Sequence, residues 1–96
     1  MFKPLPNWLT IKESPISGLG LFATQPIGKS TYIGVILIEH NDEIIRTPLG
    51  GFGNHSDNPN CEKFKYKDRW NLISKRDIKV GEELTWTYTL YNVENP

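Results

Sequence analysis

The stretch GEELTWTYTLY, residues 81–91, alternates between two kinds of side chain after an initial turn glycine. Trp86, Tyr88 and Leu90 fall on one side of this pattern, whereas three threonines and Tyr91 fall on the other. Successive side chains of a β-strand point to opposite faces of a sheet. The period of two therefore predicts a strand with one face in the core.

Further segments carry the same signal for strands. Residues 8–14 alternate, and residues 30–40 (STYIGVILIEH) are rich in β-branched residues and apolar on both faces, as in a buried central strand. Residues 63–66 and 69–74 flank the dipeptide KD and indicate a hairpin. Frequent prolines and glycines exclude a helix of average length, so we expect at most one short helical turn before Pro48. The sequence predicts a mainly β fold.

Composition indicates one small, soluble, intracellular domain. A chain of 96 residues, 38% of them hydrophobic, supports a single thin core, so we expect one domain over residues 1–96. Eleven basic residues balance eleven acidic ones, which argues against direct binding to nucleic acid or to an anionic membrane. The basic, aromatic stretch at residues 62–69 is interpreted as a solvated hairpin face. No run approaches the ~18 apolar residues that a membrane span needs.

The hexapeptide GLGLFA, residues 18–23, fits the glycine pattern of dinucleotide-binding sites, and Glu39 follows at the distance of a ribose-binding acid. Such a site needs a helix whose N-terminus faces the pyrophosphate. Only residues 24–30 separate the motif from the next strand, and they contain a proline and a glycine. We therefore reject a dinucleotide site. Gly18 and Gly20 either let a backbone approach a ligand closely or shape a turn.

Residues 50–61, GGFGNHSDNPNC, combine glycines with polar side chains and the one cysteine of the sequence. A phosphate-binding loop is excluded because the required lysine is absent. A metal site at His55, Asp57 and Cys61 lacks a standard spacing, and Cys61 as a nucleophile lacks an evident partner that would orient His55, so both are weaker alternatives. Asn54 and His55 beside the glycines favour a narrow cleft with fixed donors and acceptors for a polar ligand.

Two further readings concern the same segment. Asn58 and Asn60 are interpreted as turn residues that hydrogen-bond their own backbone. A single cysteine excludes an intramolecular disulfide and a zinc site built on several thiolates, and it is typical of a reducing environment.

Three motifs, taken in order, resemble those of the SET domain, the catalytic core of protein lysine methyltransferases. They are ESPISGLGLFAT (residues 13–24), the GGFGNHSDNPNC segment, which is similar to the family pattern F-x-N-H-S-x-x-P-N, and ISKRDIKVGEELTWTY (residues 73–88), which is similar to its R-D-I-x-x-G-E-E-L-T-x-x-Y ending. The resemblance implies a SET-domain fold of several small β-sheets, β-clip-like, with a C-terminal pseudoknot and little helix.

The resemblance also implies a function, which is transfer of a methyl group from S-adenosylmethionine to the ε-amine of a lysine in a protein or peptide substrate. Tyr88 matches the catalytic tyrosine of the family, and no metal is implied. The residues implied to bind the cofactor are Gly18, Leu19, Gly20, Asn54, His55 and Tyr88. Such an enzyme would be intracellular and cytoplasmic, or nuclear if its substrate is chromatin. The alternative is a non-catalytic, SET-like binding module that recognises a protein partner.

The sequence also departs from the family pattern. Only residues 41–53 lie where the family usually has a longer insert that forms part of the peptide groove, and no cysteine-rich zinc segment follows Tyr88. We therefore expect Trp86 and Tyr91 to cover the adenine, or a second copy of the chain to close the groove in a homodimer.

The comparison with the family pattern also leads to expectations for two single residues, Tyr32 and Gly53. Tyr32 either lines the lysine channel or belongs to the core. Gly53 replaces the branched residue that usually precedes the asparagine, and we expect it to loosen the cofactor loop.

Overall fold

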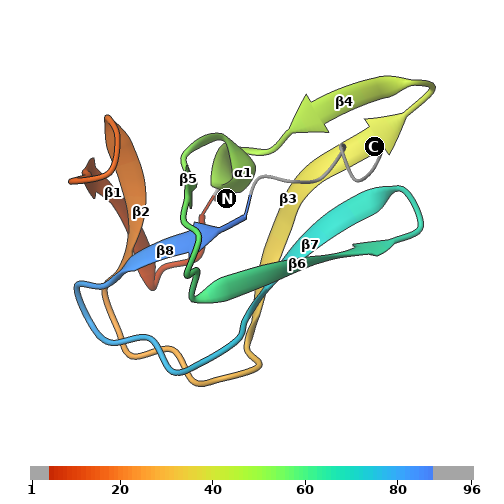
Figure 1. Ribbon diagram of the computed structural model, residues 1–96. Helices are drawn as coiled ribbons and strands as arrows, with labels where there is room; N and C mark the ends of the chain where they lie inside the picture. Colours follow the sequence, from red (N-terminus) through yellow and green to blue (C-terminus); the bar gives the residue numbers. More distant parts are fainter. Residues whose placement is uncertain (1–4, 88–96) are drawn as a thin grey trace.

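Two four-stranded sheets make up the architecture of the computed structural model, which describes residues 5–87 (Figure 1). One sheet has the strand order β1-β2-β8-β5, and the other has the order β4-β3-β7-β6. The elements are β1 (Leu9–Glu13), β2 (Leu19–Ala23), β3 (Tyr32–His40), β4 (Glu43–Arg46), α1 (Pro48–Gly51), β5 (Asn54–His55), β6 (Cys61–Tyr66), β7 (Arg69–Ser74) and β8 (Glu83–Trp86). The predicted mainly β fold with little helix is confirmed.

One cluster of buried apolar side chains joins the two sheets. Leu21 and Leu84 contribute from the first sheet, Leu37 and Leu72 from the second, and Leu49 from α1. Burial of apolar surface is the main favourable term in folding, so this shared core holds the two sheets together.

The second sheet contains the strands that the sequence predicted most directly. β6 and β7 form the expected hairpin, and Lys67 in its turn adopts a φ of 58°. β3 lies between β4 and β7, as expected of a central strand. Phe64 and Tyr66 on β6 are exposed, so the basic, aromatic stretch is a solvated hairpin face, as interpreted from the sequence.

The helical turn begins at Pro48 and does not precede it, contrary to expectation. Residues 43–46 form strand β4, which pairs with β3. Thr47 is the N-cap of α1, since its Oγ1 accepts a hydrogen bond from the backbone N–H of Gly50 at 3.1 Å. Proline fits the first helical position because its missing N–H would have no partner within the helix there.

Residues 19–23 form strand β2, where the sequence predicted no strand and left Gly18 and Gly20 as either a close approach to a ligand or a turn. β2 pairs with β1 along five residues, from Leu9 opposite Ala23 to Glu13 opposite Leu19. The GLGLFA segment is therefore an extended strand, and no helix follows it, in agreement with the rejection of a dinucleotide site.

Strand β8 is buried on both faces, although the alternation in its sequence predicted one buried face. Leu84, Thr85 and Trp86 are all buried, and β8 is an inner strand between β2, its antiparallel neighbour, and β5, its parallel neighbour (Figure 1). The course of the chain after Thr87, on which the expected pseudoknot depends, lies outside the described residues.

Candidate active site

The three sequence motifs meet at the side chain of Asn54. Its Nδ2 donates to the backbone carbonyls of Ser17 and Leu19, each at 3.2 Å, and to Oε2 of Glu83 at 2.8 Å. The glycine-rich segment, the asparagine-histidine segment and β8 are thus connected by one amide group. Asn54 acts as a fixed point between segments that are remote in the sequence.

Glu83 forms the other half of this connection. The hydroxyl of Ser14 donates to both carboxylate oxygens of Glu83 at 2.8 Å. The backbone N–H of Ser14 bonds to the carbonyl of Gly18 at 2.8 Å, and its hydroxyl accepts from the N–H of Ile16 at 2.9 Å. The loop from residue 14 to residue 18 is therefore closed on itself and attached to β8 through Glu83.

Sequence reasoning did not identify Ser14 or Glu83 as site residues. A signal existed in the two glutamates directly before the apolar and small residues of the strand, because a carboxylate at the edge of a buried segment needs fixed polar partners. The partners themselves were not visible, since Ser14 lies 69 residues away from Glu83.

The two glycines of the glycine-rich segment, Gly18 and Gly20, have different roles. Gly18 adopts a φ of +45°, a left-handed conformation that favours glycine, and a Cβ there would meet nothing within 4 Å. A Cβ on Gly20 would lie 2.2 Å from Oε2 of Glu83 and 3.1 Å from Nδ2 of Asn54. Gly20 is thus small because Glu83 and Asn54 occupy the adjacent space, whereas the backbone at Gly18 and the half-exposed Leu19 remain open to a ligand.

His55 has an orienting partner that the sequence reading did not find. Its Nε2 lies 3.0 Å from Oδ1 of Asp57, and the two side chains are 38% and 100% exposed. The backbone of His55 pairs with Trp86 in the parallel β5–β8 ladder. The ladder fixes the main chain of His55 directly beside Asn54.

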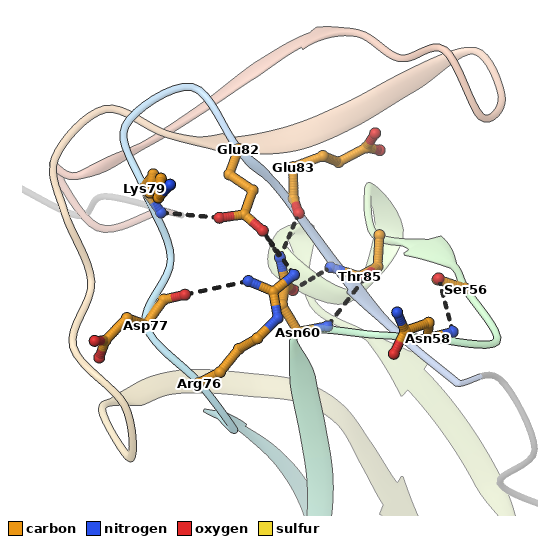
Figure 2. Close-up of polar contacts among 9 residues, drawn as sticks. All are labelled: Ser56, Asn58, Asn60, Arg76, Asp77, Lys79, Glu82, Glu83 and Thr85. Atoms are coloured by element: carbon orange, nitrogen blue, oxygen red, sulfur yellow. Dashed lines mark hydrogen bonds and ion pairs between the residues drawn. The ribbon is translucent and has the colours of Figure 1, made fainter.

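Asn60 does not bond its own backbone, contrary to the interpretation as a turn residue. It is buried, its Oδ1 accepts from the N–H of Thr85 at 2.9 Å, and its Nδ2 donates to the carbonyl of Glu83 at 2.7 Å (Figure 2). Asn58 shows no such side-chain contact within residues 5–87, and its backbone N–H donates to the hydroxyl of Ser56 at 3.1 Å. Asn60 therefore aligns the strand that carries Glu83.

Cys61 is a core residue, and neither of its proposed chemical roles fits the structure. Its side chain is fully buried on β6, and this burial raises the pKa of the thiol to about 12. The thiolate is the form that attacks electrophiles and binds metals. Within residues 5–87 there is also no group of three or more His, Cys, Asp or Glu side chains that could hold a metal ion.

We expect Cys61 to resist alkylation in the native protein. At pH 8, about four units below a pKa of 12, only about one thiol in ten thousand is ionised, and burial also blocks access. Treatment with iodoacetamide followed by intact-mass measurement should show no adduct in buffer and one adduct in guanidinium chloride. Rapid stoichiometric labelling of the folded protein would contradict the assignment of Cys61 to the core.

Trp86 and Gly53 pack directly against each other. Trp86 is 3% exposed, and a Cβ on Gly53 would lie 1.8 Å from Cη2 of its ring. Trp86 is therefore a core residue and not a cover for adenine, contrary to expectation. Gly53 does not loosen the loop either, because its missing side chain is what admits the indole ring. Tyr91, the other expected cover, lies outside the described residues.

Tyr32 is 53% exposed, so the alternative that places it in the core is wrong. Its hydroxyl donates to Oδ1 of Asn71 at 2.8 Å. Both residues line an open pocket of about 370 Å³ on the second sheet, together with Tyr66 and Arg69 among others. The alternative that Tyr32 lines a lysine channel stays a prediction.

Tyr88 itself lies outside the described residues, but the chain that leads to it is anchored. The Nζ of Lys63 on β6 donates to the backbone carbonyl of Thr87. Burial lowers the pKa of Lys63.

The described part of the chain has no helix with the length and hydrophobicity that a membrane span requires.

Comparison with known proteins agrees with this convergence of motifs. A family model for the SET domain matches residues 41–89. Over 83% of its length the chain is 37% identical to a histone-lysine N-methyltransferase, H3 lysine-36 specific, from Mycosarcoma maydis. Over 85% of its length it is 31% identical to histone-lysine N-methyltransferase 2D from Homo sapiens. The chain spans only 12% and 2% of the lengths of these two relatives.

A solved structure shows the likeness in fold. The crystal structure of a candidate histone methyltransferase from Plasmodium falciparum matches with a TM-score of 0.71, covering 94% of this chain and 100% of that chain at 19% sequence identity. The expected SET fold is thereby confirmed. The family match includes both Asn54–His55 and the strand β8 that pairs with them, and the chain therefore belongs to the SET domain family.

Proposed function

We propose that this chain binds S-adenosylmethionine and transfers its methyl group to the ε-amine of a lysine in a protein substrate. The cradle for the cofactor consists of the backbone of Gly18, Leu19 and Gly20 together with Asn54 and His55. One observation carries the proposal: the Asn54 amide holds the glycine segment and Glu83 together at 2.8 to 3.2 Å. Such a prearranged set of polar groups is what a polar ligand requires of its site.

The residues of the cradle fit this cofactor. Gly18 presents backbone without a side chain, and Leu19 is 49% exposed beside it, which suits a ligand with both polar and apolar parts. The amide of Asn54 and the carboxylate of Glu83 lie next to each other beside this backbone, 2.8 Å apart. The bound cofactor would supply an electrophilic methyl group on a sulfonium.

The acceptor lysine must be neutral to act as a nucleophile. The ordinary pKa of its amine is about 10.4, and both desolvation in a narrow channel and a nearby positive charge lower it. The chain therefore needs no strong base. Its contribution is alignment, together with a phenol at Tyr88 that would stabilise positive charge as the methyl group moves.

The relatives suggest which substrate to test first. Their names describe enzymes that methylate histone lysines, one of them at H3 lysine 36. A histone H3 peptide is accordingly the first choice, and a chromatin substrate would place this protein in the nucleus. We also propose that a second copy of the chain closes the peptide groove in a homodimer.

Titration calorimetry with S-adenosylmethionine tests the cofactor site directly. We expect one site per chain with a dissociation constant in the micromolar range, and we expect Asn54→Ala to weaken binding by about 10-fold or more, because the amide fixes the cradle. Asn58→Ala is the matched control, since Asn58 lies in the next turn of the same segment and its backbone N–H, which alanine retains, donates to Ser56. Absence of binding to the wild-type chain would rule out the enzyme and favour a binding module.

A further inference from the structure

We propose, on the basis of the proposed function, that Glu83 is the fixed negative charge of the cofactor cradle and selects the positively charged methyl donor over the product. The donor carries a sulfonium, whereas the product, S-adenosylhomocysteine, carries an uncharged thioether sulfur. A carboxylate held at the cradle would stabilise the first more than the second. This assigns a specificity role to a side chain that sequence motifs alone leave unexplained.

The position of the Glu83 carboxylate supports this role. Its Oε2 lies 2.2 Å from the point that a Cβ on Gly20 would occupy, directly beside the glycine backbone of the cradle. The hydroxyl of Ser14, which shares its one hydrogen between both carboxylate oxygens, and the amide of Asn54 hold it at donor–acceptor distances of 2.8 Å. A group with that many fixed contacts cannot swing away to find another partner in solvent.

Within residues 5–87 no basic side chain forms an ion pair with the carboxylate of Glu83. Its hydrogen-bond donors are a neutral hydroxyl and a neutral amide. A partly buried carboxylate ordinarily requires a partner of opposite charge, because its desolvation is costly. The geometry therefore points to a cationic ligand as that partner.

The neighbouring Glu82 differs from Glu83 because its carboxylate is paired with a basic side chain and a backbone N–H, as expected of a structural residue. Its Oε2 pairs with Arg76 at 2.7 Å, and its Oε1 accepts from the N–H of Lys79 at 2.9 Å. Burial acts to raise the pKa of Glu82, but hydrogen bonds from Lys79, Arg76 and Asn60 outweigh it, so that the pKa is lowered. In Figure 2 the side chain of Glu82 points toward Arg76 and Lys79, whereas that of Glu83 points away from them.

The two ligands differ by one unit of charge at the sulfur. The energy of two charges depends on their distance and on the local dielectric, and a sulfonium bound beside this partly buried carboxylate would change the dissociation constant by about an order of magnitude. A neutral sulfur gains almost nothing from the same carboxylate. The expected consequence is a lower affinity for product and easier product release.

The test compares both ligands in two matched variants. Glu83→Gln keeps the size of the side chain and an oxygen acceptor for Ser14 while it removes the charge. By calorimetry we expect its dissociation constant to rise about 10-fold for S-adenosylmethionine and less than about 3-fold for S-adenosylhomocysteine. Glu82→Gln is the control, and its ratio of the two constants should equal that of the wild type.

Three results would overturn the inference or what it rests on. Equal weakening of both ligands in Glu83→Gln would make Glu83 a structural residue only, while cofactor binding by the wild type would still support the proposed function. Failure of the wild type to bind either ligand would instead refute the proposed function. If Glu83→Gln does not fold, the salt dependence of the wild type decides, because the preference for the donor must fall as ionic strength rises. A preference that is independent of salt would overturn the inference.

Discussion

Replacement of Tyr88 by phenylalanine is expected to lower the rate of methyl transfer to a lysine peptide by about 100-fold or more. The phenol oxygen can stabilise the positive charge that develops on the methyl group and on the amine, and a phenyl ring cannot. The ring is retained, so packing changes little and the fold should persist. Single-turnover assays with mass spectrometry of the peptide would measure both the rate and the number of methyl groups added.

Asn58→Ala provides the control for this experiment. The backbone N–H of Asn58, which alanine retains, donates to the hydroxyl of Ser56, so the rate of methyl transfer should stay unchanged. A Tyr88→Phe variant that retains wild-type activity would remove Tyr88 from the catalytic site. A variant that binds cofactor normally but transfers no methyl group would separate catalysis from binding.

Substitution of Gly53 by alanine is expected to lower the free energy of unfolding by about 3 kcal/mol, a large part of the total for a domain of this size. The added Cβ would lie 1.8 Å from Cη2 and 2.3 Å from Cζ2 of Trp86. The indole is 3% exposed and packed on all sides, so it cannot move aside without disturbing the core. Chemical denaturation followed by tryptophan fluorescence would measure the loss.

Gly51→Ala is the matched control, because a Cβ at Gly51 would meet nothing within 4 Å. Its effect on stability should stay within about 0.5 kcal/mol. A second variant isolates the cause: Gly53→Ala combined with Trp86→Leu should lose less than the sum of the two single changes, because the smaller side chain leaves room for the methyl group. Strict additivity would show that contact with Trp86 is not the origin of the loss.

The fold could be predicted from the sequence to the extent that its signals are local. The alternation near β1 and β8, the β-branched run of β3 and the dipeptide between β6 and β7 each lie within a few residues. Side-chain period and turn chemistry act over that range, so the type of these elements was correct. β2 was missed because Gly18 before it and Gly20 within it suggested a turn or a close approach to a ligand, and the pairing with β1 and β8 overrides that preference.

The candidate site was predicted only as a set of motifs. Asn54 and His55 were identified, but the partners that fix them were not. Glu83 and Asn54 are 29 residues apart, and their contact depends on the parallel pairing of β5 with β8. No local pattern encodes such a pairing, so its consequences could not be anticipated.

The sequence by itself determined that the chain forms short strands with little helix and that it carries three motifs in the order of the SET domain family. Only the tertiary structure decided what surrounds each motif: that Glu83 lies beside Gly20, that Asn60 aligns β8, and that Gly53 admits Trp86. The physical reason is the separation along the sequence over which each interaction acts. Strand period and turn preference are properties of neighbouring residues, whereas hydrogen bonding and close packing in the site join segments that only the folded chain brings together.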